Sequence, residues 1–400
     1  MSRPPWTKRP PFGTTARVNA ALTPPAGDSS LVPAFAGASA TFCGIGLARF
    51  AYVPLFPAMV AAGWVTGAEA GLLGAVNLGG YLAGVAGGRS LARRTGTRAA
   101  LHLGMGLAAI SFAACAWNGG AEWLALWRGV AGAAGGVLMA LAGPAVQGAV
   151  SPARRGLAGG IVMTGVGAGV VVASVAAPLL LRAGISEAWL ALAVIVGLLW
   201  AAAGRVFPAT PVPRVAGSPP AGAGRLYLAY GLSAAGIVPH MVYFGDLVVR
   251  GRGYDTLIAS LAWLMFGIGG LTGPLLGGRV ADRWGAPVGL SIWAAVQVAA
   301  LGTALLPGLP PLLLAAFLGG FATVGATSVA LARAREIAGP QAGAVWVRAT
   351  AAFAGAQATS GFGYAALFAW TGSHGPLFGV GLGLSVLALL VLALPARRAA

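Results

Sequence analysis

The sequence predicts an all-α membrane protein of twelve transmembrane helices, arranged as two pseudo-symmetric bundles of six. Composition is the first reason: 58% of the 400 residues are hydrophobic, the mean hydropathy is +0.83 and only 8% are charged, whereas about a quarter of a soluble chain is charged. Secondly, long apolar segments follow one another with short links, as membrane-spanning helices do. Thirdly, a basic link occurs twice, at 91–98 and 278–285, nearly half the chain apart, which indicates a duplicated bundle.

The chain divides into four predicted regions. Residues 1–30 are rich in Pro, Arg, Thr and Ala and lack an apolar period, so we expect a disordered cytoplasmic tail. The first six-helix bundle is expected at 31–207, a cytoplasmic linker with five prolines at 208–222, and the second six-helix bundle at 223–396. The predicted spans are 33–61, 68–89, 97–118, 122–149, 156–181, 187–207, 224–249, 256–279, 286–306, 310–333, 341–369 and 374–395.

The positions of lysine and arginine predict how these helices are oriented. With the tail placed inside, nineteen of the 25 Lys and Arg residues fall in the tail and in the links on its side of the membrane. Such an excess marks the cytoplasmic side. Because an even number of spans returns the chain to the side where it began, we expect both termini to be cytoplasmic.

Charge and motif content exclude several classes of protein. The formal net charge is +17, but the arginines punctuate apolar segments instead of covering one soluble face, so we expect no nucleic-acid binding. Lys8 is the single lysine and is not part of a Gly-Lys-Ser/Thr sequence, so a Walker A motif is absent. Cys43 and Cys115 lie in apolar segments and are expected to be free thiols. The spacing of Cys and His fits no metal site, and we expect no cofactor.

The two basic links resemble a motif of the major facilitator superfamily (MFS). This superfamily carries the motif between the second and third spans of each half, and the better copy here lies between the eighth and ninth predicted spans. Its matching residues are Gly278, Asp282, Arg283 and Gly285. The first copy retains Arg94 and Gly96, but Arg93 stands where the motif has an acid.

Stretches in the first two predicted spans resemble a narrower family, the bacterial YbfB/YjiJ-like MFS proteins. Residues 44–57 read Gly-Ile-Gly-Leu-Ala-Arg-Phe-Ala-Tyr-Val-Pro-Leu-Phe-Pro, and residues 77–84 read Asn-Leu-Gly-Gly-Tyr-Leu-Ala-Gly. The resemblance implies the MFS fold and a multi-pass location in the bacterial cytoplasmic (inner) membrane. It also implies a secondary transporter that works by alternating access on a small-molecule substrate, and it assigns no particular substrate. We expect a monomer in the lipid bilayer.

Two arginines are the first candidates for substrate binding. Arg49 and Arg128 lie inside the first and fourth predicted spans, where a charge is costly and usually functional. The MFS arrangement implies that both spans line the central cavity, where a guanidinium can bind a carboxylate or phosphate through two hydrogen bonds. We expect Tyr52, three residues after Arg49, to lie close to the ligand, and Pro54 and Pro57 to bend the span just beyond Arg49. The alternative is that each arginine binds backbone carbonyls at a broken helix or extends to the interface.

A second candidate group lies on the seventh predicted span. His240, Tyr243 and Asp246 recur at spacing three and share one helix face. We interpret this face as a candidate proton relay, with His240 and Tyr243 also candidates for substrate contact and Asp246 the candidate for proton coupling. The alternative is an ion pair between Asp246 and Arg250, four residues apart.

The basic links are the candidate gate. Asp282, at a cytoplasmic helix end, can accept hydrogen bonds from a neighbouring helix N-terminus and pair with Arg333, which would favour closure of the cytoplasmic side. The alternative is that the links only fix the topology.

These observations favour a secondary transporter of a small organic anion, with proton coupling as an open question. Two arginines inside spans, set against almost no carboxylates there, are the reason. A proton-coupled exporter of drug-like or cationic compounds is the first alternative and would need a buried acid. A transporter-like receptor or assembly protein is the alternative from another class. We do not expect an enzyme, because no acid–base or metal cluster is present in the sequence.

Overall fold

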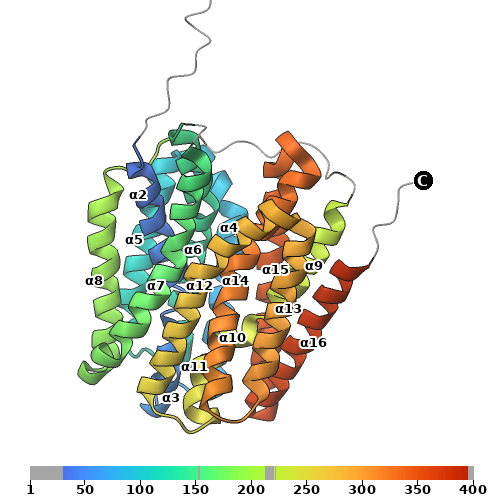
Figure 1. The fold of residues 1–400 in the computed structure, drawn as a ribbon. Coiled ribbons are helices and arrows are strands. Elements are labelled where there is room, and N and C mark those ends of the chain that lie inside the picture. The colour runs from blue at the N-terminus through green and yellow to red at the C-terminus, as the bar shows by residue number, and fades with distance from the viewer. Residues whose placement is uncertain (1–29, 152–153, 212–219, 221, 395–400) are drawn as a thin grey trace, which may run out of the picture.

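The computed structural model describes residues 30–151, 154–211, 220 and 222–394. The predicted tail, apart from Ser30, and most of the predicted linker lie outside these residues. Within them the secondary structure is helical (Figure 1). The first six spans are formed by α2 (Val32–Thr41), the π-helix η2 (Phe42–Leu47), α3 (Tyr52–Ala61), α4 (Gly67–Thr95), α5 (Thr97–Cys115), α6 (Gly120–Ala149), α7 (Arg155–Ala183) and α8 (Ile185–Gly204).

The last six spans begin with a broken helix. This broken segment consists of α9 (Ala223–Gly236), α10 (Val238–Val242), α11 (Phe244–Asp246) and the π-helix η4 (Leu247–Gly251). The remaining elements are α12 (Thr256–Trp284), α13 (Ala286–Leu305), α14 (Leu309–Ala338), the 3₁₀ turn η5 (Gly339–Gln341), α15 (Ala342–Thr371) and α16 (His374–Ala393).

The described helices supply segments for twelve membrane crossings, in agreement with the predicted fold class. In the described part of the chain, ten helical segments are long and apolar enough to span a bilayer, with α2 to α3 counted as one. The 30-residue α15 and the broken segment 223–251 supply the other two crossings. The first span was expected to bend just beyond Arg49, and no interruption was expected in the seventh. Both spans contain π-helical turns.

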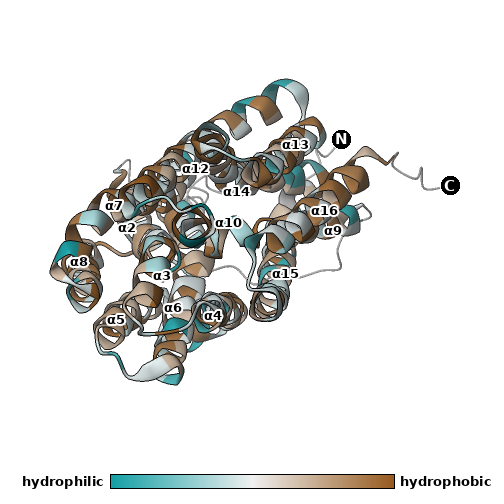
Figure 2. Ribbon diagram, turned by 90° about the horizontal axis from the view of Figure 1, so that it is seen from below, coloured by the Kyte–Doolittle hydropathy of each residue, from teal (hydrophilic) through white to brown (hydrophobic). Residues whose placement is uncertain are grey.

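The elements form two groups, which we call the first half (α2 to α8) and the second half (α9 to α16). Viewed along the helix axes, the groups lie side by side with α3 and α10 near the centre (Figure 2). Helix α4 packs against α15, and α7 packs against α12, so that both contacts join the halves. We call the end with Gly96 and Gly285 the basic end (top of Figure 1) and the opposite end, with Arg250, the Arg250 end.

Two helices extend further than expected at the basic end. The second and eighth spans were predicted to end at residues 89 and 279, but α4 ends at Thr95 and α12 at Trp284. Hydropathy marks the apolar part of a helix, whereas the helix itself ends where the backbone must turn. That turn occurs at Gly96 (φ +89°) and Gly285 (φ +83°), in a region that side chains with a Cβ rarely adopt. Arg93 and Arg94 therefore lie in the last turn of α4, and Arg283 lies in the last turn of α12. A positive charge at this end of a helix interacts favourably with the helix dipole.

Candidate functional site

The first span is interrupted where the candidate residues lie. Its break runs through η2 and a turn at residues 48–51, so it begins before Arg49 and not beyond it as expected. Both prolines lie in the following α3. Pro54 has no N–H to offer the carbonyl of Phe50, four residues earlier. That oxygen accepts instead from the backbone N–H of Val53 at 3.3 Å and from Nε1–H of Trp263, on α12 of the other half, at 3.0 Å.

Arg128 and Asn77 satisfy a second backbone acceptor of the break. Arg128 Nη1 donates to the carbonyl of Ala48 at 2.8 Å, and Asn77 Nδ2 donates to the same oxygen at 3.3 Å. Arg128 is 1% exposed, and its guanidinium carbon lies 4.5 Å from the ring centroid of Tyr52. The Tyr52 hydroxyl in turn donates to the carbonyl of Ala70 at 2.7 Å. Arg128 and Tyr52 thus hold the broken helix together, as the structural alternative predicted for arginine.

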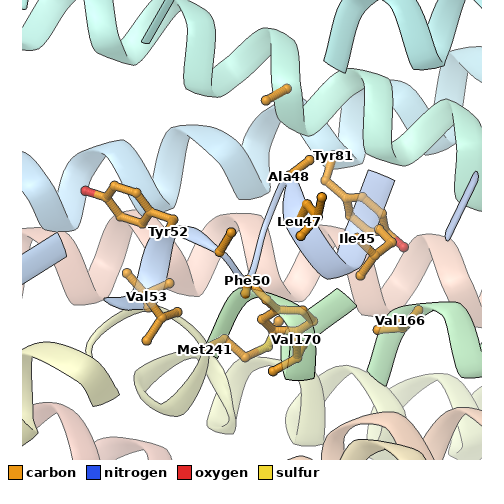
Figure 3. Packing of buried hydrophobic residues seen from close by; sticks show 14 of the residues in the cluster. Ile45, Leu47, Ala48, Phe50, Tyr52, Val53, Tyr81, Val166, Val170 and Met241 are labelled. Atoms are coloured by element: carbon orange, nitrogen blue, oxygen red, sulfur yellow. The ribbon is translucent and has the colours of Figure 1, made fainter. Parts of the chain in front are cut away.

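Arg49 lies in different surroundings. Its side chain is 8% exposed and its guanidinium carbon lies 4.2 Å from the ring centroid of Tyr81, on α4. Nε and Nη2 are buried and have no hydrogen-bond partner among the described residues. The charge of Arg128 repels that of Arg49. Figure 3 shows Tyr81 beside Ile45 on one side of the break, with Phe50 pointing the other way towards Val170 and Met241. The ring that contacts Arg49 is thus Tyr81, whereas the ring of Tyr52, which we expect near the ligand, contacts Arg128.

No acid in the described part of the chain balances Arg49. The only fully buried carboxylate there is Asp246, which is 0% exposed and already bound. Arg250 Nε and Nη2 donate to its two oxygens at 2.5 and 2.7 Å, and His374 Nε2 lies 2.7 Å from Oδ2. The sequence alternative of an Asp246–Arg250 ion pair is therefore present. His374 was not a candidate, because its partner lies 128 residues away in the sequence.

The three residues of the predicted relay are not joined by hydrogen bonds in the described structure. His240 is fully buried, with Nε2 at 3.2 Å from the carbonyl oxygen of Ala315, and its ring stacks on Phe244 at a centroid distance of 4.9 Å. The hydroxyl of Tyr243 has no partner among the described residues. Of the three, only Asp246 lies among polar side chains, those of Arg250 and His374. The described segment between α9 and α12 therefore offers one candidate proton-binding group and not a hydrogen-bonded series of such groups.

At the basic end, the contact predicted for Asp282 is made by a different acid, Glu336. Asp282 and Arg283 are exposed. Arg333 pairs with Glu336, with Nη1 and Oε2 at 2.8 Å, and not with Asp282. Glu336 Oε1 also accepts from the backbone N–H of Ala286, the first residue of α13, at 2.7 Å. The expected carboxylate at a helix N-terminus thus exists, but α14 supplies it.

Aromatic contacts between the halves lie beside the break in the first span and further towards the Arg250 end. Phe50 contacts the rings of Trp263 and Phe266 at centroid distances of 6.0 and 5.7 Å, and Phe56 contacts Tyr243 at 5.8 Å. A cavity of about 670 Å³ lies beyond these contacts, at the Arg250 end. Among the described residues, no group of three or more His, Cys, Asp or Glu could hold a metal ion.

Comparisons with known proteins agree with this architecture. A family model described as "Uncharacterised MFS-type transporter YbfB" matches residues 41–393. A solved structure described as "Crystal structure of D-xylose-proton symporter" is similar in fold, with a TM-score of 0.68 and 17% sequence identity. The match covers 90% of this chain and 96% of that one. No curated protein matches the sequence.

Proposed function

Because the chain belongs to the family described as "Uncharacterised MFS-type transporter YbfB", and is therefore an MFS-type transporter, we propose that it carries a small organic anion by alternating access. The observation that carries the anion is the unpaired guanidinium of Arg49. An arginine in the middle of a span costs about 2.5–3.5 kcal/mol on insertion scales. A buried charge that is retained without a partner points to a ligand that supplies the partner.

The charge balance favours an anion over a cation. A substrate cation would need a free acid inside the halves, and the buried carboxylate of Asp246 is fully engaged by Arg250 and His374. Arg49 offers two unused N–H groups, Nε and Nη2, which match the two oxygens of a carboxylate or phosphate. The ring of Tyr81 covers the guanidinium and would exclude water from such a pair. We therefore assign the anion to the unpartnered nitrogens of Arg49, next to Tyr81.

We place the basic end in the cytoplasm of a bacterial cell, because arginine marks the cytoplasmic side. The aromatic contacts of Phe50 and Phe56 with the second half then lie towards the outer side, and we infer from them that Arg49 is reached from the cytoplasm. Exposed Asp282 fits this state, since its proposed partners would meet it only when the cytoplasmic side closes. Asp282 remains our candidate for stabilising that second state.

Ligand binding to three forms of the protein tests the proposal. A thermal-shift screen of small carboxylates and phosphates first identifies a ligand, since a ligand bound only to the folded state raises stability. Arg49→Lys keeps the charge but loses the paired geometry, so affinity should fall at least tenfold, and Arg49→Ala should abolish binding. Arg182→Ala, at the exposed end of α7, removes a charge far from the site and should bind as the parent does. Equal affinity in Arg49→Ala and the parent would refute the proposal.

A further inference from the structure

A short part of the seventh span, beyond a break in the helix, contacts the first half near the Arg250 end. Residues 238–251, which we call the gate segment, comprise α10, α11 and η4 and are separated from α9 by a break in the helix. Three of its side chains rest on α4 of the first half at positions that have no side chain. A Cβ at Gly74 would overlap Val242, one at Gly71 would overlap Tyr243, and one at Gly67 would overlap the guanidinium of Arg250.

One carboxylate holds the gate segment in this position. Asp246 lies within the segment and binds Arg250, the residue that rests on Gly67. The same carboxylate binds His374, the first residue of α16, so that it also ties the segment to its own half. Asp246 and His374 are 0% and 8% exposed. Since an ionised carboxylate can only accept hydrogen bonds, Nε2 of His374 must carry a hydrogen and donate a hydrogen bond to Asp246.

The other charged and titratable groups near this pair are engaged elsewhere. His240, in the gate segment itself, is fully buried, its Nε2 lies 3.2 Å from the carbonyl oxygen of Ala315 and its ring stacks on Phe244, so His374 is the histidine bound to Asp246. Arg252 is turned away, because its Nη2 donates to the carbonyl of Ala304 at 2.9 Å. Glu69, in the first turn of α4, is exposed and accepts from the backbone of Thr66 at 2.7 Å. The phenols of Tyr243, in the segment, and of Tyr52, which interacts with Asp246, stay neutral at ordinary pH. Histidine alone ordinarily changes its charge between pH 5 and 8.

We propose that His374, paired with Asp246, is a proton-binding site that controls closure of the outer side. A neutral imidazole gives Asp246 one hydrogen bond, whereas an imidazolium gives a charge-assisted bond that is about twice as strong. If the gate segment moves away from α4 and α16, the imidazolium loses its carboxylate. Protonation of His374 therefore favours the closed outer side, and this stabilisation is present at low pH and lost as the pH rises.

The outer cavity gives this site access to solvent protons. Arg250, Arg252 and His374 all line the cavity of about 670 Å³ at the Arg250 end. A proton taken up from outside would thus help to close the outer side over a loaded transporter. The inference rests on the proposed alternating access but not on the anion at Arg49, and its test needs no substrate.

Distances between spin labels across the outer side test the inference. Labels are placed on Ala62→Cys and Leu306→Cys, two exposed links of opposite halves, in a background with Cys43→Ala and Cys115→Ala. In nanodiscs, the ratio of the short to the long distance should rise roughly fivefold from pH 8 to pH 5. A ratio that stays constant in this parent protein overturns the inference without any further variant.

Two histidine variants test whether His374 is the group responsible for the pH response. His374→Gln keeps an N–H donor that does not titrate, so the outer side should still close but independently of pH. His102→Gln is the matched control, because His102 bonds to Trp200 within the first half, and it should respond as the parent does. A parent-like pH response in His374→Gln would show that another group binds the proton and would overturn the assignment.

Discussion

Replacing Arg49 by methionine should stabilise the ligand-free protein while it abolishes ligand binding. Methionine has a similar length and no donors, so it removes the two buried N–H groups, Nε and Nη2, that lack partners. Each unpaired group costs about 1–3 kcal/mol, and loss of the contact with Tyr81 offsets about 2 kcal/mol of that gain. The net effect is a stabilisation of roughly 2 kcal/mol, which corresponds to a melting temperature a few degrees higher.

Arg128→Met is the matched comparison and should have the opposite sign. It removes the hydrogen bond to Ala48, worth about 1.5–3 kcal/mol for a charged donor, and the contact with Tyr52. Only the longer bond from Asn77, at 3.3 Å, then remains on that carbonyl. Relief of the unpaired Nε of Arg128 offsets about 1 kcal/mol. We expect a destabilisation of roughly 2–3 kcal/mol.

The chain contains its own probes for this measurement. Cys43 and Cys115 are free and buried, as predicted, so a thiol-reactive dye reports unfolding as the temperature rises. We predict that Arg49→Met has the highest melting temperature, the parent an intermediate one and Arg128→Met the lowest. If Arg49→Met melts below the parent, Arg49 contributes to the fold, and the argument from its unpaired groups is refuted.

Three further predictions concern the gate and the topology. Asp282→Asn should slow transport at normal expression, because the cytoplasm-closed state loses its acid; an unchanged rate in a transport assay would leave Asp282 as a topological marker. Gly74→Val should overlap Val242, hold the outer side open and slow transport, whereas Gly87→Val, which meets open space on the same helix, should not; equal transport by both would contradict the closure described. In intact cells an impermeant thiol reagent should label Leu306→Cys but not Ala209→Cys. The reverse labelling pattern would show that the protein has the opposite orientation in the membrane.

The fold could be predicted because a bilayer fixes the length of apolar segments. The number of crossings follows from that length alone, but the helix ends at the basic side do not. Arg93 and Arg94 continue α4 beyond its apolar part, and only Gly96 ends it. The break in the seventh span also escaped prediction, because a hydropathy profile does not distinguish a continuous helix from one that is interrupted within the protein.

The candidate site could be predicted only in part, because the partners of its residues depend on the tertiary structure. The cost of burying a charge singled out Arg49 and Arg128 equally, yet one has a backbone partner and the other has none. That difference depends on where the carbonyl of Ala48 lies, which no local pattern reveals. His374 shows the same limit, since it becomes a partner of Asp246 only through the packing of α16 within the second half.

Counterflow in proteoliposomes tests the central claim most directly. Vesicles that contain the parent protein are loaded with the unlabelled anion found by the screen, and the same anion, labelled, is added outside. We predict a transient accumulation of label in parent vesicles, a much smaller one with Arg49→Lys, and none with Arg49→Ala. If the parent binds the anion but accumulates no label, the protein is a receptor and not a carrier of that anion; if Arg49→Ala exchanges label as the parent does, the anion does not bind at Arg49.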